Sequence, residues 1–199
     1  MAVLTMIARV HRWRAALRPR TAWLLGLALL CAVTPGASAQ PTASAEYQLK
    51  AVFLFNFAQF VEWPARAFRD AKAPLVIGIL GEDPFGAYLD DLVSGEKIGD
   101  RPLVVHRYNR AEDLNDCHIV FISRSETRNV ENIVARLKNR SLLTVSDLDA
   151  FARRGGMVRF VMEDGKIRLR INVEAAKACE LTISSKILRP GTIVTPGKD

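Results

Sequence analysis

The sequence predicts a single mixed α/β domain, whose mostly parallel sheet is flanked by helices and ends in an antiparallel hairpin and a C-terminal helix. Continuous apolar runs at residues 74–80, 117–122 and 141–145 are typical of strands buried on both faces. Segments with helical spacing alternate with these runs, as they do in parallel sheets built from strand–helix–strand units. The dipeptide Asp164-Gly165 between two further strand-like segments indicates a tight hairpin turn.

A long helix is expected to open the domain. Apolar residues recur with helical spacing from Glu46 onward, and Trp63-Pro64 ends the helix because a residue before proline is pushed out of the α region. The helix is apolar nearly all round, which predicts burial on more than one side. Its aromatic residues either all belong to the core or leave one stripe exposed as a dimer interface. These residues are Phe53, Phe55, Phe57, Phe60 and Trp63.

The remaining elements are expected to alternate along the chain. Asp83-Pro84 is typical of a helix start, so a helix should run from about Phe85 to Leu92. The expected strands are 74–80, 101–108, 117–122 and 141–145, followed by the hairpin strands 157–162 and 166–171. The expected helices after the first strand are 85–92, 126–139, 147–154 and 173 to about 181, the last one capped by Asn172.

The first 39 residues have the layout of a secretory signal peptide. Five arginines precede an uncharged apolar run from Ala22 to Val33, and Ala37-Ser38-Ala39 then matches an A-x-A cleavage site. The apolar run is short for a membrane helix, although a retained N-terminal anchor is the alternative. We expect cleavage after Ala39, a short leader at 40–45, one domain at 46–189 and a flexible tail at 190–199. In a Gram-negative source this places the mature protein in the periplasm.

The charge of the chain does not predict a nucleic-acid partner. The formal net charge is +7, but residues 1–39 hold five arginines and no acid, so +7 minus 5 leaves +2 for residues 40–199. A nearly neutral domain has no basic patch for a phosphate backbone. Apolar residues make up 49% of the chain, which is enough for a packed core and too many for a disordered protein.

The residues that carry chemistry do not form a catalytic pattern. The glycines after the first expected strand lack the spacing of a nucleotide-binding loop, and no G-x-S-x-G elbow is present. The histidines and cysteines lack zinc-ligand spacing. We therefore expect a binding or regulatory protein without a metal or cofactor rather than an enzyme, with an unrecognised hydrolase as a weak alternative.

Cys117 and Cys179 are the thiols that remain after cleavage. An even number of cysteines in an oxidising compartment favours a disulfide between them. Sequence alone does not bring their Cα atoms within the roughly 7 Å that a bridge requires. The alternatives are two buried free thiols or pairing between chains.

Several motifs resemble the YfiR family. The longest is EYQLKAVFLFNFAQFVEWP at residues 46–64, and further matches follow in the same order up to about residue 189. They are IGILGEDPFG at 77–86, CHIVFIS at 117–123, LTVSD at 143–147, FARRGGM at 151–157, IN at 171–172 and ISSKIL at 183–188. In the family the cysteine matched by Cys117 pairs with one in the first strand, where this chain has Ile77-Gly78-Ile79. A second family bridge, near the Gly-Gly turn, also lacks its cysteines.

The resemblance implies a regulatory function. Members of this family are periplasmic repressors of a membrane-bound diguanylate cyclase of YfiN type, and an outer-membrane lipoprotein of YfiB type sequesters them. A homodimer is also implied. The alternative is a periplasmic solute-binding protein that holds a small molecule in an α/β cleft. As partner-binding residues outside the sheet core we predict Phe85, Tyr88, Arg153, Arg154 and Arg189.

Overall fold

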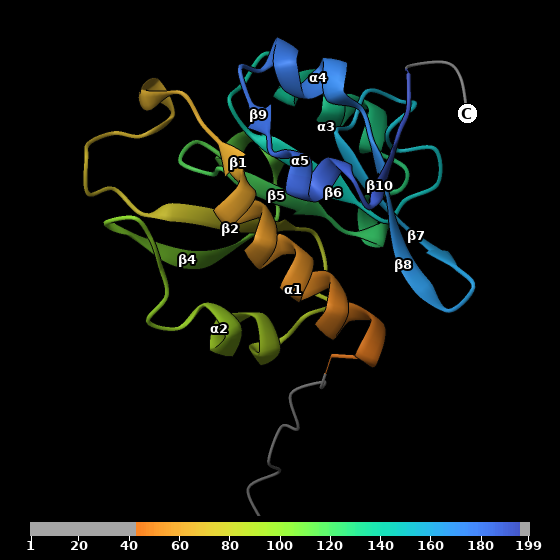
Figure 1. Cartoon of the computed structure of the whole chain (residues 1–199), viewed down its shortest axis with the longest axis horizontal. Coiled ribbons are helices and arrows are strands. Elements are labelled where there is room, and N and C mark those ends of the chain that lie inside the picture. The colour runs from red at the N-terminus through yellow and green to blue at the C-terminus, as the bar shows by residue number, and fades with distance from the viewer. Residues whose placement is uncertain (1–42, 196–199) are drawn as a thin grey trace, which may run out of the picture. The chain divides into compact units, whose positions relative to one another are not determined.

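The computed structural model describes residues 43–195, which form a mixed α/β sheet with helices on both faces (Figure 1). The strands of the large sheet lie in the order β10-β8-β7-β6-β5-β2-β4-β3, and β1 and β9 form a separate pair. The strands are β1 (Val61–Glu62), β2 (Leu75–Leu80), β3 (Lys97–Ile98), β4 (Arg101–Tyr108), β5 (Ile119–Ile122), β6 (Leu143–Ser146), β7 (Val158–Glu163), β8 (Lys166–Ile171), β9 (Thr182–Ile183) and β10 (Gly191–Ile193). The α-helices are α1 (Ala45–Phe60), α2 (Ala87–Val93), α3 (Val130–Leu137), α4 (Val173–Ala178) and α5 (Ser185–Leu188).

The pairing of the strands confirms the predicted fold class. β2 runs parallel to β4 and β5, and β5, β6 and β7 continue the parallel arrangement. β7 and β8 form the predicted antiparallel hairpin. The chain passes from β2 to β4 on one side and then to β5 on the other, which is the order of a doubly wound sheet. In such sheets, ligand sites form at the carboxyl ends of the strands.

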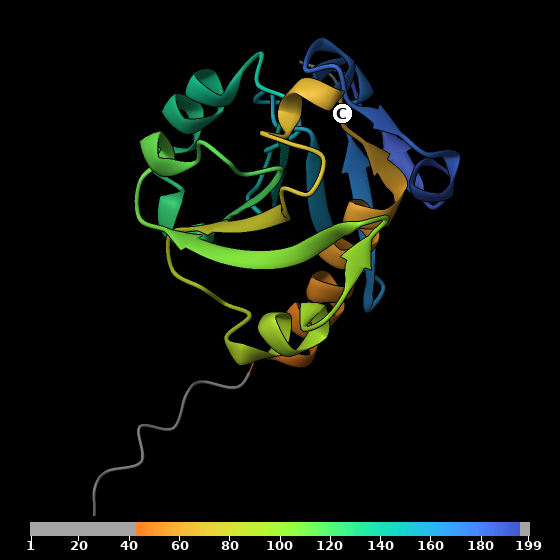
Figure 2. The same ribbon diagram turned by 90° about the vertical axis from the view of Figure 1, so that its left-hand side faces the viewer.

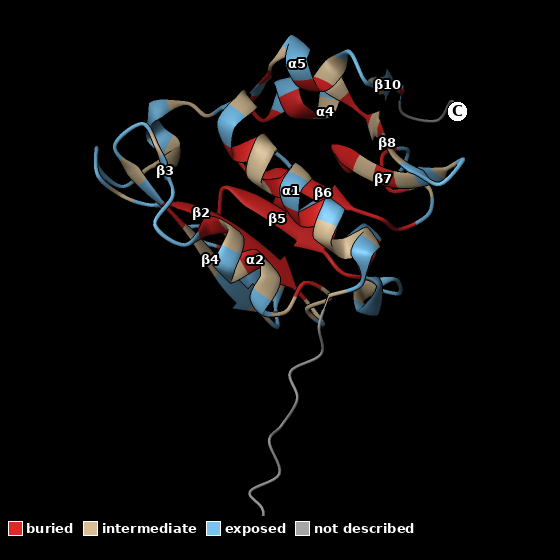
Figure 3. Ribbon diagram, turned by 60° about the horizontal axis from the view of Figure 1, so that its bottom comes forward, coloured by how far each residue is buried: buried red, intermediate tan, exposed pale blue. Residues whose placement is uncertain are grey.

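The central strands are apolar because both of their faces are covered. Every residue of β2, β5 and β6 is buried (Figure 3). Successive side chains point to opposite faces, so Ile77 and Ile119 pack on the side of α1 while Val76 and Val120 pack on the side of α3. Figure 2 shows α3 on one side of β2 and β4, and α1 and α2 on the other. Two hydrophobic clusters result, one on each face.

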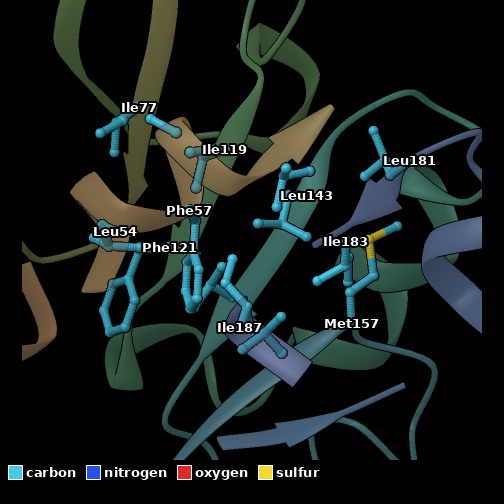
Figure 4. Close-up of a cluster of buried hydrophobic side chains, with 14 of the residues drawn as sticks. Leu54, Phe57, Ile77, Ile119, Phe121, Leu143, Met157, Leu181, Ile183 and Ile187 are labelled. Carbon is cyan, nitrogen blue, oxygen red and sulfur yellow. The ribbon is translucent and has the colours of Figure 1, made fainter. Parts of the chain in front are cut away.

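Helix α1 contributes most of the cluster on its side of the sheet. The Ser44 side chain caps its first turn by accepting from the Tyr47 N–H. Leu54 and Phe57 are buried against Ile119, Phe121 and other core residues (Figure 4). The aromatic side chains of the long first segment all belong to this core or pack against it. The exposed large apolar residues of α1 are instead Leu49 and Val52.

Some predicted elements differ from the structure. The helix expected at 147–154 is wrong, because these residues form turns. Ala150 has a left-handed backbone with φ 57°, which interrupts a right-handed helix. The helix expected at 126–139 is confined to α3, and a 3-10 turn at Arg124–Glu126 precedes it. The helix expected from Phe85 begins two residues later, since the Asp83 carboxylate accepts from the Phe85 and Gly86 N–H groups in a turn.

The predictions for the two ends of the chain compare differently with the structure. The signal peptide at 1–39, its cleavage site and residues 40–42 of the expected leader at 40–45 lie outside the described residues. Of the expected flexible tail at 190–199, residues 191–193 form β10, which pairs in parallel with β8. The sheet therefore continues beyond residue 189, where we expected the domain to end. Within residues 43–195, no helix has the length and apolar character needed to cross a membrane.

Candidate functional site

A group of charged side chains gathers at the carboxyl ends of β5 and β6. Asp147 follows directly after β6, and Arg124 follows two residues after β5. Because these parallel strands are neighbours, their carboxyl ends place the two residues at the same edge of the sheet. The Ser146 hydroxyl donates to the Ile122 carbonyl at 2.7 Å and accepts from the Leu148 N–H at 3.1 Å, which fixes the backbone on both sides of Asp147.

Lys50 of α1 supplies the opposite charge for Asp147. The Lys50 side chain is 1% exposed and that of Asp147 is 2% exposed, and Lys50 Nζ lies 2.5 Å from Asp147 Oδ2. The Tyr47 hydroxyl donates to the same oxygen at 2.9 Å, and Arg124 Nε lies 3.2 Å from it. Glu46 Oε1 is also 2.5 Å from Lys50 Nζ. We call these five side chains the Lys50–Asp147 network.

The network keeps Asp147 ionised in spite of its burial. Burial raises the pKa of Asp147, but the hydrogen bonds and charges of Lys50, Tyr47 and Arg124 outweigh this effect and hold the pKa below its ordinary value. Burial and the neighbouring Asp147 carboxylate raise the pKa of Tyr47 to about 12. The phenol therefore remains a donor at neutral pH. A single charged residue, Lys50, in the middle of an apolar helix was the signal in the sequence for this network, and our prediction did not use it.

A second feature is a sheet face that no helix of the described chain covers. On β7 and β8 the residues Val158, Phe160, Leu169 and Ile171 are buried on the side of α1. The opposite face of these strands is partly or fully exposed, and it continues onto β10 through Thr192, which pairs with Arg170. We call this surface the β7–β8–β10 face, and its residues are Arg159, Val161, Glu163, Lys166, Arg168, Arg170 and Thr192.

The β7–β8–β10 face is basic and hollowed. It carries four cationic side chains and one carboxylate. Arg170 pairs with Glu163 at 2.5 Å and Arg159 pairs with Asp149, whereas no carboxylate of residues 43–195 forms an ion pair with Lys166 or Arg168. A hollow of about 420 Å³ lies along its edge, between Val161 and residues 192–195. Such a surface can bind an acidic partner.

The structure corrects one of the predicted partner-binding residues. Phe85 is not outside the core, because it is completely buried and its ring contacts Tyr47 and Phe121 edge-to-face with centroids 5.6 and 4.9 Å away. The loop before α2 turns the ring toward the sheet rather than toward solvent. Phe85 is therefore a packing residue in this structure.

The other predicted partner-binding residues do not form one surface. Tyr88 is half-buried on α2, which packs against β4, whereas Arg189 is exposed after α5, which packs against β10. β4 and β10 lie at opposite ends of the sheet order. Arg153 and Arg154 are exposed in the turn between β6 and β7, and Arg154 Nε lies 3.8 Å from Glu131. Only these two neighbours are brought together.

The two cysteines are not bridged. Cys117 and Cys179 are both buried free thiols, and Cys117 belongs to the cluster beside α3 while Cys179 belongs to the cluster beside α1. Their positions in different clusters explain why the possible disulfide is absent. Burial raises the pKa of Cys117 to about 12 and also raises the pKa of Cys179. Burial therefore disfavours the thiolate form of both cysteines at neutral pH.

Comparison with known proteins identifies the family. The model of the family described as YfiR/HmsC-like matches residues 47–191, nearly all of the described chain. The chain belongs to the YfiR/HmsC-like family. No curated protein sequence matches it. The family match confirms the resemblance carried by the sequence motifs, and it makes the chain a regulator of cyclic di-GMP signalling in a family that is regulatory rather than catalytic.

Within residues 43–195, no group of three histidine, cysteine or carboxylate side chains could hold a metal ion. Two other features of the described chain are available for recognition. The Lys50–Asp147 network ties α1 to the end of β6 by ion pairing. The β7–β8–β10 face offers an uncovered surface for a partner. In a YfiR/HmsC-like protein, these two features are the candidate sites for recognition.

Proposed function

We propose that this YfiR/HmsC-like protein acts in the periplasm and represses a membrane-bound diguanylate cyclase of YfiN type by contact with its periplasmic sensor domain. The family match over residues 47–191 is the observation that carries the proposal. Secretion by the leader, with cleavage after Ala39, brings the protein to this compartment. An outer-membrane lipoprotein of YfiB type relieves the repression by sequestering the protein, which acts as a homodimer.

Repression by contact requires a difference in affinity. A protein that binds the active and inactive states of a cyclase equally well does not shift the equilibrium between them. The repressor must therefore bind the inactive state better. Moving the balance from 99:1 to 1:99 takes a preference of about 5.5 kcal/mol. A few buried anchors, often arginine or aromatic side chains, usually supply most of the energy of an interface.

The β7–β8–β10 face is the surface that we propose for this contact. Lys166 and Arg168 project from a strand that is buried on its other side, so their backbone positions are fixed before binding. Val161 lies opposite Arg168 on the neighbouring strand and gives the face an apolar centre. The partner is therefore an acidic surface that buries Val161 and pairs with the two cations.

Deletion and complementation test the repression. We expect deletion of the gene to raise cyclic di-GMP and surface attachment. Expression of the full chain in the deletion strain should return both to the wild-type level. The variant Arg168→Glu should fail to restore them and should no longer recover the cyclase when tagged protein is isolated from membranes. Lys177→Glu is the matched control, since Lys177 is exposed on α4 and lies outside the β7–β8–β10 face.

Each outcome decides a separate part of the proposal. Unchanged cyclic di-GMP after deletion, under several growth conditions, would contradict repression of a cyclase. If Arg168→Glu lowers cyclic di-GMP as completely as the original chain does, the β7–β8–β10 face is not the contact surface. Failure of Lys177→Glu to restore repression would place the contact on α4 instead.

A further inference from the structure

A groove lies between helices α3 and α4, and its lining includes no residue of the β7–β8–β10 face (Figure 1). Its volume is about 430 Å³, which is within the range of small-molecule sites in proteins. One wall is the face of α3 that carries Glu131, Val134, Ala135 and Lys138, whose spacing makes them neighbours on the helix surface. The other wall is α4, and the turn before β7 also lines the groove.

The middle of the groove is apolar and accessible from solvent. Ala135 and Ala178 are exposed, and Val134 and Ala175 are half-buried, so a molecule in the groove can contact these side chains. Alanine on both walls leaves space between the two helices, because its side chain is a single methyl group. A longer side chain at Ala178 would fill part of this space.

The buried hydroxyl and the buried amide in the lining need no ligand. Thr144 Oγ1 accepts from the Met157 N–H at 3.0 Å. Asn172 Oδ1 accepts from the Ala175 N–H at 3.0 Å, and Asn172 Nδ2 donates to the Ala152 carbonyl at 3.1 Å. Because these polar atoms are already hydrogen-bonded within the protein, the groove presents mainly apolar contacts to a ligand. The part of the ligand that lies in the middle of the groove is therefore a hydrocarbon.

The charges of the lining lie toward the two ends of this apolar stretch. At one end Arg154 Nε lies 3.8 Å from Glu131 Oε1, so these two charges compensate each other. At the other end, no carboxylate of residues 43–195 forms an ion pair with Lys138. Glu131 and Lys138 are separated by about 10 Å along the axis of α3. The groove therefore offers a short apolar stretch that ends at one uncompensated cation.

We propose that this groove binds a small amphiphile, whose hydrocarbon chain lies between Val134 and Ala178 and whose single anionic group pairs with Lys138. A carboxylate with an unbranched chain of medium length has this chemistry. Burial of the chain supplies most of the binding energy, and the exposed ion pair fixes the direction in which the chain lies. The site is separate from the β7–β8–β10 face, so its test does not depend on the contact with a cyclase.

Titration with octanoate tests the site. Protein produced from the full chain, with methyl groups labelled with carbon-13, is titrated in low-salt buffer below the micelle concentration of octanoate. We expect saturable displacement of the methyl signals of Val134, Ala135 and Ala178, with one octanoate bound per chain. The signals of Ile193, an exposed apolar residue outside the groove, should not change. Acetate lacks the hydrocarbon chain and should give no saturable change, and octylammonium, which carries the opposite charge, should bind more weakly than octanoate.

Two variants, each with a matched control, test the two parts of the site. Ala178→Leu fills the groove and should weaken octanoate binding at least about tenfold, whereas Ala87→Leu adds the same side chain at an exposed position of α2 and should not. Lys138→Gln should weaken octanoate about threefold and leave the affinity for octanol unchanged, because only octanoate loses an ion pair. Lys177→Gln is its control, since Lys177 is exposed on α4 and does not line the groove.

Several results would overturn the proposal. One is the lack of a saturable change in the groove with octanoate, and another is a response of Ile193 at the same concentrations, which would show nonspecific binding. Octylammonium that binds as tightly as octanoate, or an unchanged affinity of Lys138→Gln for octanoate, would contradict the anionic group. Equal affinity of Ala178→Leu and the original chain would contradict the groove as the site. If Ala178→Leu does not fold, Lys138→Gln and the comparison of probes in the original chain decide.

Discussion

Lys50 Nζ lies 2.5 Å from Asp147 Oδ2, although the two residues are 97 positions apart in the chain and both side chains are almost fully buried. The contact joins the middle of the first helix to the end of a central strand. A buried ion pair contributes little net stability compared with apolar residues of the same volume, but removal of one partner leaves an uncompensated charge. This relationship makes Lys50 a sensitive position in the domain.

We predict that Lys50→Met lowers the free energy of unfolding by about 3–5 kcal/mol, because Asp147 then keeps its charge in a buried position with fewer donors. Urea denaturation followed by circular dichroism measures the loss. Lys177→Met is the control, since Lys177 is exposed and its ion pair with Glu174, at 3.4 Å, lies on the surface. The double variant Lys50→Met/Asp147→Leu should recover most of the lost stability. A loss below about 1 kcal/mol in the single variant would show that the pair is not structurally important.

Much of the sheet could be predicted because its strands are buried on both faces. The apolar runs that contain β2, β5 and β6 end close to the structural bounds, and the Asp164-Gly165 turn fixed the hairpin of β7 and β8. Strands β1, β3, β9 and β10 have only two or three residues, which is too short for a periodic pattern. They depend on tertiary contacts, such as the pairing of Val61 with Ile183.

The candidate site was less predictable, since it depends on side chains that meet only after folding. Asp147 sits in a motif that the sequence analysis used for the family resemblance, but nothing local connects it with Lys50. The uncovered β7–β8–β10 face is a consequence of strand order, because no helix of the described chain lies over the far side of the hairpin. Phe85 was assigned to the surface because helix α2 was expected to begin at this residue.

The free energy of unfolding should decrease as the pH falls below neutral, because His118 is buried in its uncharged form. The Val76 N–H donates to His118 Nδ1 at 3.2 Å, and His118 Nε2 lies 3.1 Å from the Ala67 carbonyl, so Nε2 carries the hydrogen. Burial is the main cause that lowers the pKa of His118 from its ordinary 6.5. Protonation of Nδ1 would also remove the acceptor for Val76.

The sign of this effect follows from proton linkage. The unfolded chain takes up a proton at His118 near pH 6.5 and the folded chain only at lower pH. The full contribution is therefore present above pH 6.5 and is lost as the pH falls from there toward the folded pKa. Urea midpoints measured between about pH 7 and 5 should decrease. In His118→Asn the urea midpoint should depend less on pH. In His106→Gln the dependence should stay as in the original chain, since His106 is exposed. An unchanged slope in His118→Asn would assign the effect to other groups.

We predict that the protein forms a homodimer through α1. Leu49 and Val52 are 55% and 36% exposed and lie about one turn apart on the helix, so they form an apolar spot on the domain surface. The double variant Leu49→Lys/Val52→Lys should be monomeric in sedimentation velocity at micromolar concentration, where the original chain should be a dimer. Ile193→Lys is the control, because Ile193 is 62% exposed and belongs to β10 rather than to α1. A monomeric original chain would rule out the dimer under these conditions.

Gly78 of β2 lies against the side chain of Cys117, which precedes β5, and this closeness suggests an engineered disulfide. A Cβ atom placed on Gly78 would lie 2.6 Å from Cys117 Sγ, closer than an ordinary nonbonded contact. A covalent bridge relieves the clash with the sulfur, because bonded cysteines hold the Sγ of one close to the Cβ of the other. The Tyr108 ring must shift to make room, since its Cε2 would lie 2.9 Å from the new Cβ. This position also explains why Cys117 remains a free thiol in the described chain: the residue opposite it has no side chain.

We predict that Gly78→Cys forms a disulfide with Cys117 and raises stability by about 2–4 kcal/mol, because the bridge closes a long loop in the unfolded chain. Thiol titration of the denatured, unreduced variant should show that the sulfurs at positions 78 and 117 no longer react. A reducing agent should reverse the gain in the urea midpoint. Gly95→Cys is the control, since a Cβ atom at Gly95 meets no other atom within 4 Å and its thiol should remain free. If the thiols at positions 78 and 117 both titrate as free, the bridge does not form and the prediction is wrong. The two side chains then compete for the same space, and Gly78→Cys should be destabilised by about 1–3 kcal/mol.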